Sequence, residues 1–380
     1  MFAISEMMER IKGSERSQSI SSAPKGAILL NRGEPDFSTP AHIQEAACRA
    51  MENNFTHYGS SRGDEELREA ICLSLYRDFG VERKPDEVLV TAGGIAAIHT
   101  IVATYLNPGD EALVMDPGYS AYAECIRLFG GKPVFVPLTE TFHIDFDALK
   151  KRITERSKFI FIANPSNPTG VVLTEEEIRG LAKVAEENEL ILIVDEVYHK
   201  LVYEGVKHFS VCQVEEIKDR SILLNSFSKT YAMTGWRVGY LVTGSEMIRD
   251  LELFHKTILI CVNTVAQKAC AAALKGPQDC VQQMILQYDK RRKVVDRALR
   301  GMPGVDVNPC EGTFYFFPRF AHKKTSREMM QILAAKGVMV RSGTEFGERG
   351  QSRIRISFTT SMELLEEGLA RMKKALRELE

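Results

Sequence analysis

The chain has 380 residues, with 49 Lys and Arg residues against 51 Asp and Glu residues and a formal net charge of −2 at pH 7. Because a domain takes roughly 100 to 200 residues, this length predicts about two domains and excludes a small fold held together by disulfides. A composition of 44% hydrophobic and 26% charged residues is ordinary for a globular protein, and the balanced charge indicates neither a nucleic-acid nor a membrane partner.

The sequence favours a cytoplasmic location. Near the start of the chain, Glu6, Glu9 and Arg10 interrupt the apolar run that a signal peptide would need. The longest apolar stretches, such as residues 190–194, are far shorter than the ~18 residues of a membrane span. The eight cysteines include no C-x-x-C pair, so we expect them to be reduced thiols.

Short apolar runs that predict strands alternate along the chain with longer stretches of helical spacing. The predicted strands cover residues 88–91, 112–115, 159–163, 190–194, 222–224 and 238–242. The predicted helices cover residues 95–106, 120–129, 174–188 and 245–258, and Thr174 and Glu177 have the spacing of a capping box. This alternation predicts an α/β fold with a mostly parallel sheet covered by helices on both faces.

The last hundred residues have a different pattern, which is more helical and has fewer strands. Apolar runs at 312–317, 338–341 and 353–358 predict the strands of a separate small sheet. We therefore predict a large domain at residues 46–280 and a small α+β domain formed by residues 1–45 and 281–380.

Five of the predicted strands are followed directly by polar, glycine-rich or aromatic segments. These segments cover residues 92–94, 116–119, 164–170, 195–198 and 225–229. Because parallel sheets bind ligands at the carboxyl ends of their strands, we expect the segments to meet at one ligand site.

Gly93 and Gly94 lie between a predicted strand and a predicted helix. Backbone N–H groups at such a helix start suit a phosphate, with no Cβ in the way. Taken alone, a glycine pair is also typical of a tight connection without a ligand.

Lys229, Asp195 and Tyr198 are the candidate catalytic residues. A lysine that forms a Schiff base must lose its proton, from a reference pKa of about 10.4, and a desolvated pocket with a second cation such as Arg237 assists this loss. Asp195 ends the most apolar predicted strand, where an unpaired carboxylate is costly to bury. It is either a cap or salt-bridge partner, or a carboxylate that faces the protonated ring nitrogen of a cofactor, with Tyr198 near the same ring.

Together these residues resemble the class I pyridoxal-phosphate-dependent aminotransferases of fold type I, the family that contains aspartate aminotransferase. The resemblance extends from residues 33–37 to residues 355–358. It implies pyridoxal 5′-phosphate as cofactor and transfer of an amino group from an L-amino acid to a 2-oxo acid, with 2-oxoglutarate as the expected acceptor, by a ping-pong mechanism.

The resemblance also implies a role for each residue around the cofactor ring. Lys229 would hold the cofactor as a Schiff base and then move a proton between the substrate and the cofactor. Asp195 would pair with the ring nitrogen, while Asn167 and Tyr198 would bind the ring hydroxyl oxygen. Tyr119 would stack on one ring face.

On the opposite ring face, the resemblance places Val197. It implies that the cofactor phosphate is bound by the backbone of Gly93, Gly94 and Ile95 and by the side chains of Ser226 and Arg237.

For the substrate, the resemblance implies that Arg355 binds the α-carboxylate in a bidentate fork, with Asn167 and the Gly33 backbone beside it. It also implies a homodimer with a shared site, in which Tyr58 reaches the phosphate held by the neighbouring subunit.

Two departures from the family pattern bear on substrate choice. Ile95 stands where acid-specific bacterial relatives have a lysine, which favours non-acidic donors. Arg341 and Ser342 precede Gly343 where a Pro-Gly pair is usual, so we expect a different edge to the substrate pocket. Strand alternation turns either Phe314 or Tyr315 toward this cleft.

Other functions remain open at the level of sequence. A C–S β-lyase or a decarboxylase would use the same fold and cofactor, and retention of Arg355 weakens the decarboxylase alternative. A ligand-sensing regulator on this fold would need a fused DNA-binding segment or a broken lysine motif, and we expect neither. His57, His99, His143 and His199 lack partners at ligand spacing, so no metal site is predicted.

Overall fold

Six of the seven strands in the large sheet are those that the sequence predicts. The computed structural model describes residues 3–12 and 23–379. The strand order is β2-β8-β7-β6-β5-β3-β4, and β8 runs in the opposite direction to the other six strands. The strands are β2 (Val88–Thr91), β3 (Glu111–Asp116), β4 (Lys132–Pro137), β5 (Ser157–Ala163), β6 (Ile191–Asp195), β7 (Ser221–Ser226) and β8 (Gly239–Val242).

The strand that the sequence analysis missed, β4, lies at the edge of the sheet. It pairs only with β3, and it contains Pro133 and Pro137. Proline removes a backbone donor, so a run with two prolines does not read as a strand, although an edge strand tolerates them because one side needs no ladder.

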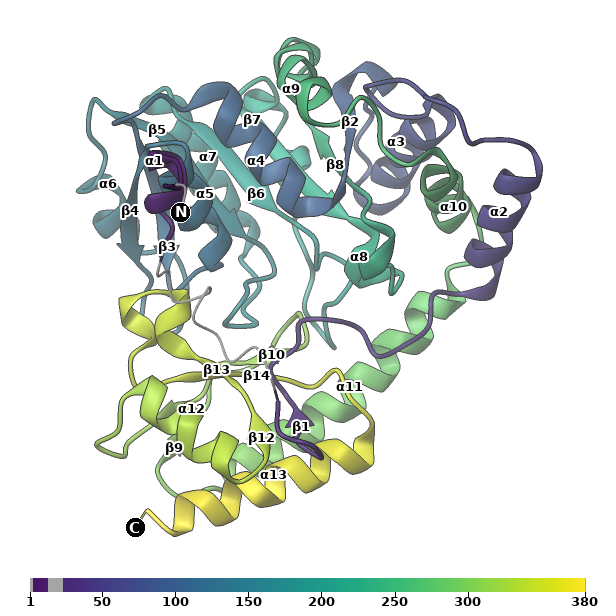
Figure 1. Cartoon of the computed structure of the whole chain (residues 1–380). Coiled ribbons are helices and arrows are strands. Elements are labelled where there is room, and N and C mark those ends of the chain that lie inside the picture. Colours follow the sequence, from purple (N-terminus) through teal and green to yellow (C-terminus); the bar gives the residue numbers. More distant parts are fainter. Residues whose placement is uncertain (1–2, 13–22, 380) are drawn as a thin grey trace.

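Helices cover both faces of the large sheet, which confirms the predicted α/β architecture (Figure 1). Successive strand residues point to opposite faces, so Phe159 and Phe161 pack on one side of β5 and Ile160 and Ile162 on the other. The first side is covered by α4 (Gly93–Tyr105), α5 (Ser120–Leu128) and α9 (Ser245–Ile258). The second side is covered by α3 (Glu65–Phe79), α7 (Glu175–Glu187) and α10 (Thr264–Lys275).

The capping box predicted at Thr174 is present at the start of α7. The Thr174 hydroxyl accepts from the Glu177 N–H at 3.2 Å, and Glu177 Oε2 accepts from the Thr174 N–H at 2.9 Å. Glu177 also accepts from the Ile144 N–H at 2.9 Å, so this cap fixes a neighbouring loop as well as the helix.

Outside the large sheet, the described strands form three small sheets instead of the single small sheet that the sequence predicts. Strands β10 (Tyr315–Phe316), β14 (Ile354–Ser357) and β13 (Arg341–Ser342) form an antiparallel sheet. By contrast, β12 (Val338–Met339) pairs in parallel with β1 (Ile28–Leu29). A third pair joins β9 (Val305–Asp306) and β11 (Arg319–Phe320). Segments from the two ends of the chain therefore lie side by side.

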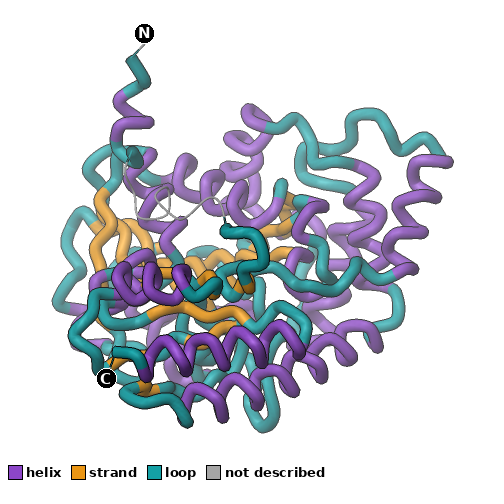
Figure 2. Tube along the Cα trace, turned by 60° about the horizontal axis from the view of Figure 1, so that its bottom comes forward, coloured by secondary structure: helices purple, strands orange, loops and turns teal. Residues whose placement is uncertain are grey.

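Long helices lie against these small sheets (Figure 2). They are α11 (Asp279–Arg300), α12 (Ser326–Ala335) and α13 (Met362–Arg377), and α11 packs against α13. The remaining α-helices are α1 (Glu6–Glu9), α2 (Ala41–Glu52), α6 (Phe146–Lys150) and α8 (Phe227–Thr230).

The predicted division into two domains stays a prediction. Its boundary at residue 280 falls in the first turn of α11, and residues 1–2, 13–22 and 380 of the predicted small domain lie outside the described residues. All eight cysteines are free thiols, as predicted. Across residues 3–12 and 23–379, no helix is long and apolar enough to cross a membrane.

The cap at α7 gives a test of the fold. Thr174→Ala removes the hydroxyl that accepts from Glu177, so we expect it to lower the free energy of unfolding by about 1 kcal/mol. The shift in the urea midpoint measures this loss. Glu176→Gln, in the exposed part of the same turn, is the control and should change it by less than about 0.5 kcal/mol. Equal midpoints for Thr174→Ala and the wild-type chain would show that the cap contributes nothing.

Candidate active site

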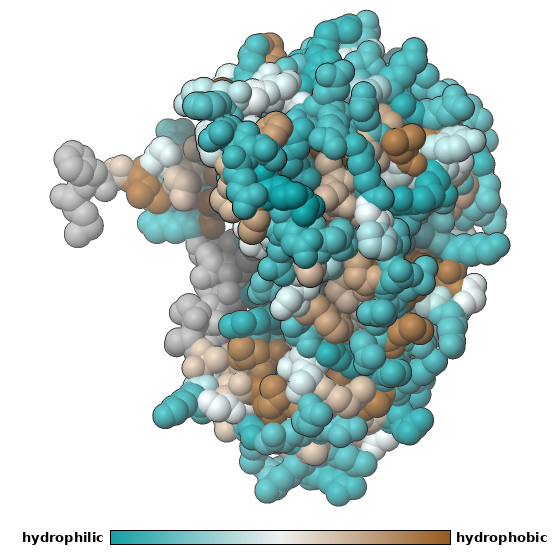
Figure 3. Space-filling view, turned by 90° about the vertical axis from the view of Figure 1, so that its right-hand side faces the viewer, coloured by the Kyte–Doolittle hydropathy of each residue, from teal (hydrophilic) through white to brown (hydrophobic). Residues whose placement is uncertain are grey.

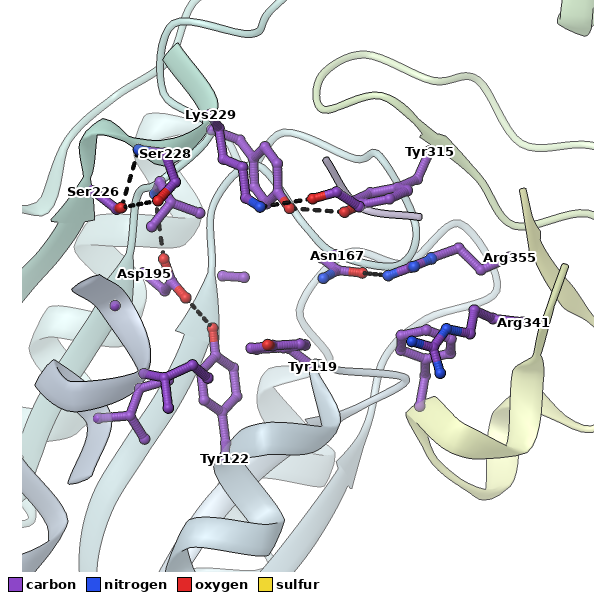
Figure 4. A pocket seen from close by; sticks show the side chains of 18 of the residues that line it. Tyr119, Tyr122, Asn167, Asp195, Ser226, Ser228, Lys229, Tyr315, Arg341 and Arg355 are labelled. Atoms are coloured by element: carbon purple, nitrogen blue, oxygen red, sulfur yellow. Dashed lines mark hydrogen bonds between the residues drawn. The ribbon is translucent and has the colours of Figure 1, made fainter. Parts of the chain in front are cut away.

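A cavity of about 250 Å³ lies between the carboxyl edge of the large sheet and the small β10-β14-β13 sheet (Figure 4). The predicted site residues that line it are Gly33, Gly94, Ile95, Tyr119, Asn167, Asp195, Val197, Tyr198, Ser226, Lys229, Arg237 and Arg355. Gly93 is not part of this lining. It precedes Gly94 in the chain and lies next to Arg237. Tyr58 is 81% exposed and does not line the cavity.

The parallel strands explain why residues so far apart in sequence meet here. β6 ends at Asp195, and β7 ends at Ser226, from which the short helix α8 carries Lys229. The loop after β3 supplies Tyr119, and the loop after β5 supplies Asn167.

The Lys229 amine is buried in this cavity. Its Nζ donates a hydrogen bond to the Gly33 carbonyl oxygen at 2.7 Å. Burial lowers the pKa of Lys229 from 10.5 to about 8, and the neighbouring cations Arg355 and Arg237 add to this effect. A lysine with this pKa has a sizeable neutral fraction near neutral pH, which an amine nucleophile or proton acceptor needs.

The Asp195 carboxylate lies in the same cavity. Burial raises its pKa from 3.8 to about 6, while hydrogen bonds from the Tyr122 hydroxyl at 2.7 Å and the Val197 N–H at 3.2 Å oppose this rise. A cationic group placed against Asp195 would favour the ionised carboxylate further. The carboxylate is therefore suited to face a protonated ring nitrogen.

Tyr122 is a site residue that the sequence analysis missed. It lies in α5, one turn after Tyr119, and its ring packs edge-on against the Tyr119 ring with centroids 5.5 Å apart. The 119/122 spacing is the only signal in the sequence, and it also fits two ordinary core residues.

Tyr198 and Tyr315 meet across the cavity. Their hydroxyl oxygens lie 2.9 Å apart in a hydrogen bond, so the strand end and the small sheet are joined at this point. Of the two aromatic residues that alternation left open, Tyr315 lines the cavity and Phe314 is buried in the core.

One end of the cavity is built for an anion. Gly93 has φ +81°, a backbone conformation that favours glycine, and a Cβ there would lie 2.7 Å from Arg237 Nη2 at the start of α4. The Ser226 hydroxyl lies on the same side and accepts from the Ser228 N–H at 3.2 Å. A helix start, a guanidinium and a hydroxyl together are typical of a phosphate site.

The opposite end contains the buried Arg355. Its Nη1 donates to Asn167 Oδ1 at 3.0 Å and its Nη2 to the Asn31 carbonyl oxygen at 3.0 Å. The guanidinium carbon lies 4.2 Å from the Tyr315 ring centroid and 5.0 Å from that of Phe346. Its Nε is buried and, within the described part of the chain, has no hydrogen-bond partner.

Further cavity residues were not assigned a role from sequence. They are Ile98, Tyr122, Ala163, Ser228, Glu345 and Phe346. Arg341, at the position where the sequence departs from the family pattern, also lines the cavity. Among the residues that the structure describes, no group of three or more His, Cys, Asp or Glu side chains could hold a metal.

Comparison with known proteins identifies the family. The family model described as aminotransferase class I and II matches residues 25–372. The chain is 38% identical to the probable aspartate aminotransferase of Methanocaldococcus jannaschii over 98% of this chain and 99% of that protein. It is 36% identical to aromatic-amino-acid aminotransferase 2 of Thermococcus litoralis over 99% of both chains.

Solved structures agree with this result. An aromatic aminotransferase from Pyrococcus horikoshii has a TM-score of 0.92 at 37% identity, covering 98% of this chain and 99% of that one. Aspartate aminotransferase from Thermus thermophilus with maleate has a TM-score of 0.91 at 32% identity, covering 99% of this chain and all of the other. The chain belongs to the aminotransferase class I and II family. It is a class I transaminase with fold type I.

The lowered pKa of Lys229 gives a test of the site. In cofactor-free protein, labelling of Lys229 by an amine-selective reagent should rise with pH around a midpoint near 8, because only the neutral amine reacts. Mass spectrometry of the Lys229 peptide measures this midpoint, with the exposed Lys183 as the control. A midpoint for Lys229 near 10.5 would contradict the buried amine.

Proposed function

We propose that this transaminase uses pyridoxal 5′-phosphate to transfer the amino group of an L-amino acid to a 2-oxo acid, with 2-oxoglutarate as acceptor, by a ping-pong mechanism. The observation that carries the proposal is that Lys229, Asp195 and Arg355 line one cavity. An amine with a lowered pKa, a carboxylate for a ring nitrogen and a guanidinium for a carboxylate are the groups that this chemistry needs.

The residues of the cavity fit the proposed cofactor. The backbone of Gly93, Gly94 and Ile95, with Ser226 and Arg237, would hold its phosphate at the end of the cavity described above. Asp195 would face the ring nitrogen, and Lys229 would hold the cofactor covalently. When bound, pyridoxal phosphate supplies a carbonyl carbon that condenses with amines and an electron-poor ring that withdraws electrons from the substrate Cα.

Around the ring, Asn167 and Tyr198 would bind the hydroxyl oxygen, while Tyr119 and Val197 would pack on the two faces. All four residues line the cavity, which supports these roles. The hydrogen bond of Tyr198 to Tyr315 also orients its hydroxyl group.

Arg355 would bind the substrate α-carboxylate, with Asn167 and the Gly33 backbone beside it. The rings of Tyr315 and Phe346 beside Arg355 restrict its guanidinium, so the substrate meets a fixed fork. The neutral Lys229 amine would then accept the proton of the substrate Cα and return it as the product forms.

We also propose a homodimer in which Tyr58 completes the cavity of the partner subunit. Tyr58 is exposed and lies outside the cavity of its own chain, which fits a residue that acts across an interface. The face on the side of α2 carries apolar surface among hydrophilic residues (Figure 3), and Met51 and Phe55 at the end of α2 are exposed. A cytoplasmic location remains a prediction from the sequence.

Removing the amine of Lys229 tests the catalytic assignment. We expect Lys229→Ala to lower kcat for transamination by at least about 10² to 10⁴-fold, the contribution of a general base, with further loss from the missing covalent bond. Circular dichroism and gel filtration should show an unchanged fold and dimer. Transamination at the wild-type rate by Lys229→Ala would refute the assignment.

The half-reaction tests the reaction type. Enzyme given an amino acid without an oxo acid should convert its cofactor once to the aminated form, followed by absorbance, and then stop. Continuous release of pyruvate and ammonia would instead indicate a β-lyase, and continuous release of CO₂ a decarboxylase.

Removing the Tyr122 hydroxyl tests how Asp195 is kept ionised. Because this hydroxyl donates to the carboxylate, Tyr122→Phe should raise the pKa of Asp195 and lower kcat by about 10- to 100-fold, the usual effect of a hydrogen bond to a charged group. A pH titration of the cofactor absorbance and steady-state kinetics measure these changes. Tyr105→Phe, at a tyrosine that does not line the cavity, is the control. An unchanged pKa of Asp195 and an unchanged kcat in Tyr122→Phe would contradict this role.

A further inference from the structure

Arg341 lies beside the residue proposed to bind the substrate carboxylate. In the antiparallel pair of β13 and β14, Arg341 is the direct partner of Arg355. Directly opposite residues point to the same face of a sheet, with Cβ atoms about 5 Å apart. Both side chains line the cavity, and Figure 4 shows the two guanidinium groups extending from neighbouring strands toward its interior.

Two like charges placed opposite each other are destabilising unless an anion lies between or beside them. Arg341 has one such anion, because its Nη1 lies 3.2 Å from Glu345 Oε2 in an ion pair. Arg355 has no ion-pair partner among the carboxylates of the described chain. Its hydrogen-bond partners are the Asn167 side-chain amide and the Asn31 backbone carbonyl. The pair of arginines therefore has more positive charge than Glu345 balances.

The Arg341 side chain also has one unsatisfied hydrogen-bond donor. Its Nε is buried and has no hydrogen-bond partner among residues 3–12 and 23–379, while 27% of the side chain as a whole is exposed. Glu345, in contrast, is 8% exposed, so its carboxylate is fixed beside Arg341. A second carboxylate that entered the cavity would meet Arg341 in its lining and a net positive field.

We propose that the Arg341–Glu345 pair determines substrate choice: Arg341 binds the distal carboxylate of dicarboxylic 2-amino and 2-oxo acids, and Glu345 neutralises it when the substrate side chain is uncharged. The inference rests on the proposed function, since Arg355 takes the α-carboxylate. A four- or five-carbon diacid has carboxyl carbons about 4 to 5 Å apart, from C–C bonds of about 1.5 Å, which suits groups on directly opposite residues.

This assignment changes what Ile95 implies. Ile95 lacks the cation that acid-specific relatives have at that position. For this reason the sequence analysis favoured non-acidic donors. Arg341 supplies a cation from the other wall of the cavity. The enzyme then accepts both acidic and uncharged side chains, because Glu345 removes the cost of leaving Arg341 without a substrate anion.

The test is equilibrium binding of unreactive acids to the purified holoenzyme, measured by calorimetry and by the cofactor absorbance. Glutarate carries two carboxylates, and butyrate carries one. Arg341→Met should weaken glutarate binding by about 10- to 100-fold and change butyrate binding by less than about twofold, because only the diacid loses a charged contact. Arg300→Met, an exposed arginine on α11, is the matched control and should change neither.

Glu345→Gln gives a second measurement that does not remove the arginine. It should tighten glutarate binding by about threefold or more, because the competing carboxylate is gone, with little effect on butyrate. Equal losses for both acids in Arg341→Met, or unchanged glutarate binding in both variants, would overturn the proposal. Failure of the wild-type enzyme to transaminate any donor would instead refute the proposed function, and the binding comparison would still report on Arg341.

Discussion

The candidate active site depends on burying an amine and a carboxylate at the same edge of one sheet. Parallel strands end together, so the segments after β6 and β7 bring Asp195 and Lys229 to one cavity although 34 residues separate them in sequence. Burial there disfavours both charges: it lowers the pKa of Lys229 and raises that of Asp195. A bound cation facing Asp195, and a covalent partner for Lys229, would relieve both costs.

Much of the large sheet is predictable because its signals are local. Apolar runs give the strands, the spacing of Thr174 and Glu177 gives a cap, and residues that follow strands must lie at the carboxyl edge. The edge strand β4 was missed because its prolines hide it, and prolines are tolerated where no second neighbour needs a donor. The sequence predicts one small sheet where the structure has three. Pairing such as that of β1 with β12 joins residues over 300 positions apart, so it leaves no local pattern in the sequence.

The residues that sequence reasoning missed act through partners that only the fold reveals. Tyr122 donates to a carboxylate 73 positions away, and nothing in its own neighbourhood indicates this bond. Arg341 was noticed only as a departure from a family pattern, and its relation to Arg355 depends on the strand register. Long-range register and side-chain pairing are therefore what the three-dimensional structure adds to the site.

The central claim is that the coenzyme is attached covalently to Lys229. Purified protein should be treated with borohydride, digested and analysed by mass spectrometry. The account predicts a reduced pyridoxyl phosphate group on the peptide that contains Lys229 and on no other lysine. An unmodified Lys229 peptide from fully loaded, active enzyme, or an adduct on a different lysine, would contradict it.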